Sequence, residues 1–121
     1  MSTDVCVPLS MLPDAISHAS SLLEKYGLIG GIVGHVGDGN FHALIMIDPN
    51  DPIESDKAHT VNQKIVEFAI DCGGTATGEH GIGLGKIDYL YKEHASSIHL
   101  MKMIKGQFDP LGILNPGKMF K

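Results

Sequence analysis

The sequence predicts an α+β protein with a ferredoxin-like fold, in which an antiparallel sheet carries its helices on one face. Three strand-like segments contain short apolar runs or apolar residues in alternation. Two longer segments instead repeat apolar residues at helical spacing. These segments follow one another as strand, helix, strand, strand and helix, which is the split arrangement of ferredoxin-like folds.

The first half of the chain supplies three strands and one helix in this prediction. A short strand is expected at residues 4–9. The helix that follows Ser10 is expected to reach Tyr26, with Gly27 closing it. Its apolar stripe consists of Leu12, Ala15, Ile16, Ala19, Leu22, Leu23 and Tyr26. Two further strands are expected at residues 28–36 and 40–48, on either side of the turn sequence GDGN.

The second half is predicted to be mainly helical. A loop at residues 49–52 precedes a helix at 55–72, which two glycines end. A short strand is expected at 75–77, followed by a glycine-rich loop at 78–85. Weaker helical patterns cover residues 86–94 and 97–108. The segment 109–120 contains two prolines and two glycines, and we expect it to form an ordered tail over a surface.

Composition narrows the classes of function. The 121 residues suit one domain spanning positions 1–121. The net charge is −5 and all nine basic residues are lysines, which argues against a nucleic-acid partner. No apolar run reaches the ~20 residues of a membrane span, and the opening MSTDVCVPLS is not expected to act as a signal or transit peptide. Cys6 and Cys72 are expected to be free thiols.

The stretch GHVGDGNFH predicts a β-hairpin that carries two histidines. An Asp-Gly pair at 38–39 favours a two-residue turn. Pairing outward from that centre sets His35 opposite His42 on one face, and Val36 opposite Phe41 on the core side. A divalent metal is the partner that suits two neutral imidazoles, whereas the alternative is a solvated polar face.

The stretch TGEHGIGLGK, residues 77–86, offers further ligands. Glycines on both sides of Glu79 and His80 would let both side chains approach a common partner. Glu79 could complete a three-ligand metal site with the two hairpin histidines, and His80 could act as a base beside the ion. Alternatively, Glu79 caps the following helix. The glycine spacing does not match that of a phosphate-binding loop.

Together, GHVGDGNFH, TGEHGIG and the C-terminal FDPLGILNPGK resemble the C-terminal domain of FAD-linked 2-hydroxyacid dehydrogenases of the vanillyl-alcohol oxidase type. The resemblance spans essentially the whole chain. The opening DVCVPLS and the phenylalanine of GDGNFH are most similar to members that oxidise D-lactate in mitochondria. Members of this family have two domains, of which one holds FAD and the other caps the substrate over the flavin.

The resemblance implies a role for five residues. His35, His42 and Glu79 would bind a divalent metal, zinc or manganese, that holds the carboxylate and hydroxyl of the substrate. His80 would be the base that takes the hydroxyl proton as hydride passes to FAD. Asn115 would lie near the flavin. An electron acceptor such as cytochrome c and a mitochondrial location are implied as well.

The chain also departs from the family pattern. It contains no FAD-binding domain and no arginine to bind the substrate, so it is expected to be the C-terminal part of an enzyme and inactive alone. Leu44 stands where family members that oxidise 2-hydroxyglutarate carry a polar residue, which favours a small substrate such as lactate. Two alternatives use the same residues without flavin. These are a metal-dependent hydrolase or lyase, and a non-catalytic ferredoxin-like module with a structural metal.

Overall fold

The computed structural model describes all residues, 1–121, as two compact units, Met1–His80 and Gly81–Lys121. The first unit contains β1 (Val5–Cys6), α1 (Leu12–Tyr26), β2 (Gly30–His35), β3 (Asn40–Ile45) and α2 (Pro52–Asp71). Two short 3-10 turns, η1 (Leu9–Met11) and η2 (Val36–Asp38), precede α1 and join β2 to β3. The second unit contains α3 (Ile87–His94) and α4 (Ile98–Phe108).

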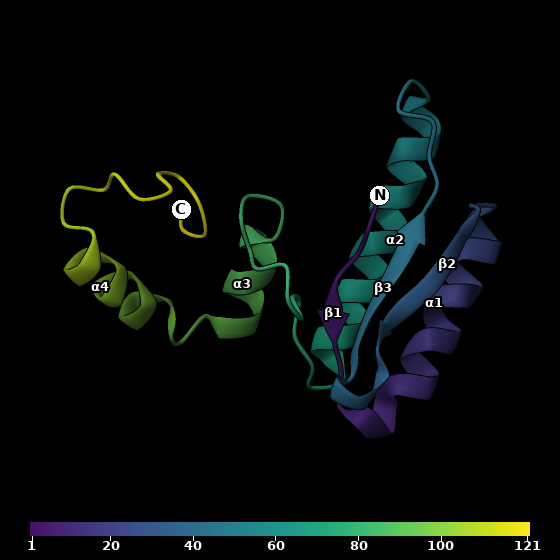
Figure 1. Ribbon diagram of the computed structural model, residues 1–121, viewed down its shortest axis with the longest axis horizontal. Coiled ribbons are helices and arrows are strands. Elements are labelled where there is room, and N and C mark those ends of the chain that lie inside the picture. Colours follow the sequence, from purple (N-terminus) through teal and green to yellow (C-terminus); the bar gives the residue numbers. More distant parts are fainter. The chain divides into compact units, whose positions relative to one another are not determined.

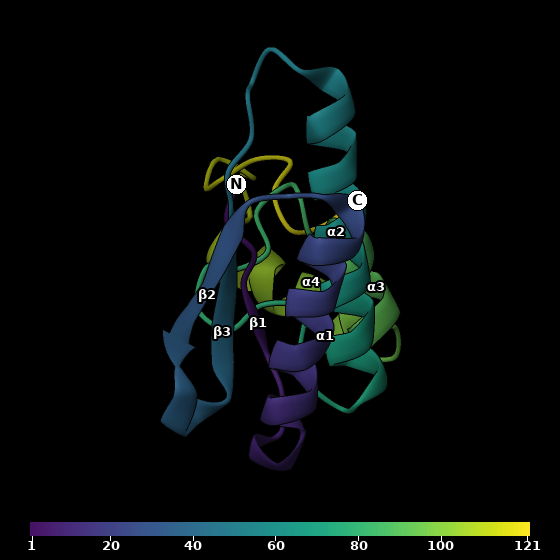
Figure 2. The ribbon, with the colours of Figure 1, turned by 90° about the vertical axis from the view of Figure 1, so that its right-hand side faces the viewer.

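The sheet of the first unit has three antiparallel strands in the order β1-β3-β2 (Figure 1). Figure 2 shows α1 and α2 together on one side of this sheet. The expected α+β class, with an antiparallel sheet and helices on one face, is therefore confirmed. Thr75 adds a single bridge to Cys6, where a short strand was expected.

The core of the first unit lies between the sheet and its two helices. Val5, Phe41 and Ile45 contribute from the strands and are each at most 2% exposed. Val61 and Ile65 face them from α2 and are equally buried. Because strand side chains alternate between faces, burial of these strand residues leaves their neighbours on the opposite, open face of the sheet.

Helix α2 begins earlier than its apolar pattern suggested. The carboxylate of Asp51 accepts hydrogen bonds from the backbone N–H groups of Ile53, at 2.8 Å, and Glu54, at 3.2 Å. Pro52 therefore occupies the first helical turn, where its missing N–H costs nothing. The predicted loop at 49–52 thus ends in a helix cap.

The second unit is held together by its C-terminal tail. Asp109 caps the turn after α4 by accepting hydrogen bonds from the N–H groups of Ile113, at 2.9 Å, and Leu114, at 3.0 Å. The Met119 N–H bonds to the Gly83 carbonyl at 2.9 Å. The expected ordered tail is therefore present within this unit. None of the helices is both long and apolar enough to cross a membrane.

Candidate metal centre

The predicted site residues of the hairpin lie on the open face of the sheet. Phe41 and Ile45 of β3 are buried on the side of the helices. Alternation along the strand therefore places Asn40, His42 and Leu44 on the opposite face. The site is thus built on the side of the sheet that the two helices leave uncovered.

The predicted pairing of the two hairpin histidines is wrong. His42 pairs with Val33, and His35 pairs with Asn40. The connection is a four-residue loop at 36–39, in which η2 is followed by Gly39 with a φ of +75°. Val36 therefore lies in the loop and is 62% exposed, so that it does not pair with Phe41 on the core side.

The turn shifts because the Asp-Gly pair is used differently from the prediction. The two-residue turn that we expected needs a positive φ at both of its central positions. Here only Gly39 has a positive φ, and its N–H bonds to the Val36 carbonyl at 3.4 Å. A Cβ at Gly39 would lie 2.1 Å from the Val7 carbonyl oxygen, so this position also needs glycine for its close approach to the chain after β1.

The two histidines still share a face. His35 is opposite Asn40, and Asn40 is two residues from His42 on the same strand. The imidazoles are therefore diagonal neighbours, a relationship for which Cα atoms lie roughly 7–8 Å apart. At this separation, the two imidazoles need a third side chain between them to form one site.

Glu79 supplies that link. Its Oε1 lies 3.2 Å from Nε2 of His42, and its Oε2 lies 3.6 Å from Nε2 of His35. The His35 and Glu79 side chains are 66% and 48% exposed, whereas that of His42 is only 10% exposed. The predicted trio is therefore brought together in a cluster that opens to solvent on one side.

The hydrogen bonds of His42 fix the form of its ring. Nδ1 lies 3.0 Å from the Thr3 carbonyl oxygen and 3.6 Å from Oδ1 of Asp4. Because both neighbours can only accept, Nδ1 carries the proton in the neutral ring. The lone pair of Nε2 then points toward the Glu79 carboxylate, which can also only accept.

A cation is needed between these two acceptors. Either a second proton on His42 or a metal ion would satisfy both Nε2 and Oε1. A neutral imidazole with its other nitrogen bonded to a carbonyl is the usual form of a metal-binding histidine. Two imidazoles and one carboxylate suit a divalent ion such as zinc or manganese and leave coordination positions open. The residues therefore fit the group that the sequence suggested.

His80 lies beside this cluster. Its ring stacks on that of His42, with centroids 4.9 Å apart and planes 12° from parallel. Its Nε2 is 4.0 Å from Oε1 of Glu79, and its side chain is 50% exposed. His80 is therefore placed beside the cluster, with its ring partly open to solvent.

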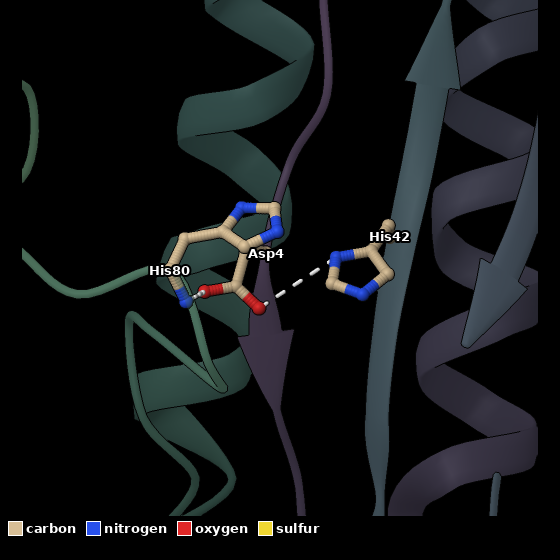
Figure 3. Close-up of side chains that lie close together, drawn as sticks. All are labelled: Asp4, His42 and His80. Atoms are coloured by element: carbon tan, nitrogen blue, oxygen red, sulfur yellow. Dashed lines mark hydrogen bonds and ion pairs between the residues drawn. The ribbon is translucent and has the colours of Figure 1, made fainter. Parts of the chain in front are cut away.

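Asp4 is a central residue that the sequence analysis missed. Figure 3 shows its carboxylate between His42 and the backbone of His80. Asp4 is only 1% exposed, which is unusual for a carboxylate. The sequence places it at the start of the strand expected at residues 4–9, but that position gives no sign of which segment it would face.

Asp4, His42 and His80 also form a group whose possible ligand atoms all lie within 4.8 Å of one another. This trio suits a metal ion less well than His35, His42 and Glu79. The oxygens of Asp4 already accept hydrogen bonds from Asn40, at 2.9 Å, and from the turn that carries Glu79 and His80. The nitrogen of His42 that faces Asp4 is engaged with the Thr3 carbonyl.

Asn115 lies in the second unit, apart in the chain from the other predicted site residues. It has a φ of +47°, and its carbonyl accepts a hydrogen bond from the Lys118 N–H at 3.2 Å. Asparagine is one of the few residues that adopt this left-handed conformation readily. Within its own unit, Asn115 therefore has a clear role in turning the tail.

Comparisons with known proteins show the family to which the chain belongs. The chain is 46% identical over 121 residues to the probable mitochondrial D-lactate dehydrogenase of Danio rerio. This match covers 99% of the chain and 24% of that protein. It is 45% identical to the mitochondrial D-lactate dehydrogenase [cytochrome] of Arabidopsis thaliana, covering 98% of this chain and 21% of the relative. The glycolate oxidase subunit GlcD of Escherichia coli K12 is 39% identical, and the match covers 95% of this chain and 23% of that subunit.

The chain thus spans about a quarter of the length of these curated relatives. The family described as FAD linked oxidases, C-terminal domain, matches residues 1–119, which is nearly the whole chain. The chain therefore belongs to the C-terminal domain family of the FAD linked oxidases.

Proposed function

We propose that this chain is the substrate- and metal-binding part of a flavin-dependent dehydrogenase that oxidises D-lactate, or a similarly small D-2-hydroxyacid, to the 2-oxoacid. The observation that carries the proposal is the Glu79 carboxylate, which lies within 3.6 Å of the Nε2 atoms of both His42 and His35. The D-lactate dehydrogenases among the relatives support the choice of substrate class.

His35, His42 and Glu79 would hold the divalent ion. When bound, such an ion supplies positive charge that binds the carboxylate and hydroxyl of a 2-hydroxyacid and makes the hydroxyl more acidic. The protein's own contribution is to keep Nε2 of His42 free of a proton through the bond from Nδ1 to the Thr3 carbonyl. The chain has no arginine, so a cation here would compensate for the missing guanidinium.

His80 would accept the hydroxyl proton of the substrate. Oxidation of a 2-hydroxyacid removes this proton and a hydride from the carbon that bears the hydroxyl. FAD, when bound, supplies the acceptor for that hydride. The half-exposed ring of His80 stacks on His42 and can reach a substrate on the open side of the cluster, as a general base must.

Two apolar residues beside His42 favour a short aliphatic substrate. Val33 is the direct cross-strand partner of His42, and Leu44 is two residues further along β3 on the same face. They are 51% and 43% exposed, so neither is committed to the core. A methyl group would be desolvated favourably against them, whereas a second carboxylate would meet no cation among the side chains of this pair.

The remaining features of the proposal come from the relatives. Several are named as mitochondrial enzymes, and more than one of them also carries the word cytochrome in its name. We infer a mitochondrial location for this protein and an acceptor such as cytochrome c. The FAD would be bound mainly by a partner domain of the full-length flavoprotein, and Asn115 is our candidate for a contact with it.

The role of His80 can be tested in the full-length flavoprotein that contains this chain. His80→Ala should keep its metal, because His80 is not in the proposed ligand set, yet lower the rate of flavin reduction by D-lactate by about 100- to 10,000-fold. Single-turnover stopped-flow spectroscopy measures that rate, and metal analysis measures the content. His99→Ala, an exposed histidine of α4, is the matched control. Undiminished flavin reduction in His80→Ala would rule out this assignment.

A further inference from the structure

The buried carboxylate of Asp4 is engaged by the turn that carries Glu79 and His80. It accepts hydrogen bonds from three successive backbone N–H groups, those of Gly78 at 3.0 Å, Glu79 at 3.2 Å and His80 at 3.0 Å. The hydroxyl of Thr77 donates to the same carboxylate at 2.8 Å. Charge-assisted bonds of this kind are stronger than neutral ones, so the path of the turn is set by Asp4.

Asn40 holds the carboxylate from the other side. Its Nδ2 donates to Oδ1 of Asp4 and to the Val5 carbonyl, both at 2.9 Å, which fixes the orientation of the amide. Its Oδ1 is buried and has no hydrogen-bond partner. A buried acceptor that is left unsatisfied lowers the stability of a fold, so this asparagine is costly for fold stability alone. The donor that it offers to Asp4 accounts for its presence.

Gly78 allows the turn to approach this pair closely. A Cβ atom at that position would lie 1.7 Å from Nδ2 of Asn40 and 2.9 Å from Oδ1 of Asp4. Any side chain here would push the turn away from the carboxylate. The glycine before Glu79 is therefore required by this contact and not by a positive φ.

We propose that Asp4 is a positioning residue for the metal centre: it anchors the turn at residues 77–80 so that Glu79 faces His42 and His80 stacks on it. Asp4 is not itself a ligand, because its oxygens are occupied by donors of the turn and of Asn40. This inference rests on the proposed metal-binding function. It means that the affinity for the metal ion and the placement of His80 both depend on Asp4, which is not a ligand.

The test measures Co²⁺ binding by the 121-residue chain, together with the visible absorption spectrum of the bound ion. Asp4→Asn keeps the shape of the side chain and removes its charge. Loss of a group that supports a metal ligand weakens affinity by about 10- to 100-fold, which is the effect we expect. At saturating Co²⁺ the spectrum should match that of the wild type, since the ligands are unchanged. Asp56→Asn, an exposed aspartate of α2, is the control.

A second measurement does not depend on metal. Hydrogen exchange of the backbone amides of Gly78, Glu79 and His80 should accelerate in metal-free Asp4→Asn, because these donors lose their charged acceptor. If Asp4→Asn does not fold, Gly78→Ala provides the same test by displacing the turn from an intact Asp4. Gly37→Ala is its control, since a Cβ there meets nothing within 4 Å and its φ is not positive.

The outcomes distinguish a failure of the proposed metal-binding function from a failure of the positioning role of Asp4. If the wild type binds no Co²⁺, the proposed function fails. If the wild type binds Co²⁺ and Asp4→Asn binds it equally well, only the positioning role fails. A spectrum of saturated Asp4→Asn that differs from that of the wild type would make Asp4 a ligand and would also overturn the inference.

Discussion

At the scale of single residues, the chemistry of the site depends on which nitrogen of His42 carries a proton. The contact between Nδ1 and the Thr3 carbonyl, together with the nearby Asp4, places that proton on Nδ1. Nε2 is then the atom available to a cation beside Glu79. If Nε2 carried the proton instead, His42 would donate to Glu79 and no metal would be needed.

This tautomer is a direct prediction. In the metal-free chain, nitrogen NMR at a pH where histidines are neutral should show His42 protonated at Nδ1. Exposed histidines such as His59 serve as internal references in the same spectrum. Protonation of His42 at Nε2 would contradict the assignment and would favour a simple hydrogen bond to Glu79.

At the scale of elements, the sequence predicts the types of the segments better than their pairing. The helices expected at 86–94 and 97–108 are found as α3 and α4 within one residue at each end. Their start and stop signals are local, so periodicity is enough to find them. The hairpin register was missed because it depends on the contact of Gly39 with the chain after β1, which is a long-range constraint.

In the site too, the sequence predicts local features but not contacts between distant segments. Glu79 was predicted from its flanking glycines, and it does lie between the two histidines. Asp4 was missed because its partners are far away in the chain: Asn40 is 36 residues from it, and the turn at 77–80 is 73 to 76 residues from it. A single sequence contains no signal for such a contact. The glycine at position 78 was expected to let Glu79 and His80 approach a common partner, whereas in the structure it allows the turn to pack closely against Asn40.

A prediction on pH belongs to the turn after α4. The hydrogen bond from Lys105 holds the pKa of Asp109 below its ordinary value of 3.8. A depressed folded-state pKa means that ionised Asp109 stabilises the turn above 3.8, and that this stabilisation is lost as the pH falls through the lower, folded value. The amide shifts of Ile113 and Leu114 should therefore move with a midpoint below 3.8. In Asp109→Asn they should be displaced already at neutral pH, and a midpoint at or above the ordinary value would argue against this cap.

At the scale of the whole molecule, the chain divides into two units whose hydrophobic cores differ in size. Most of the buried apolar residues belong to the first unit, whereas the second buries Leu90 and Ile98. The proposed ligands, the proposed base and Asp4 all lie in Met1–His80. The proposed metal centre therefore belongs to the better-packed unit, and its properties should be measurable in the 121-residue chain.

Metal binding by this chain tests the proposed site of His35, His42 and Glu79 without relying on flavin or substrate. Equilibrium dialysis with Zn²⁺ or Mn²⁺ should find about one ion per chain for the wild type, as a three-ligand site predicts. His42→Ala should lose this ion, whereas His59→Ala, an exposed histidine of α2, should retain it. Equal binding by all three proteins, or no binding by the wild type, would contradict the central claim that His35, His42 and Glu79 form a metal centre.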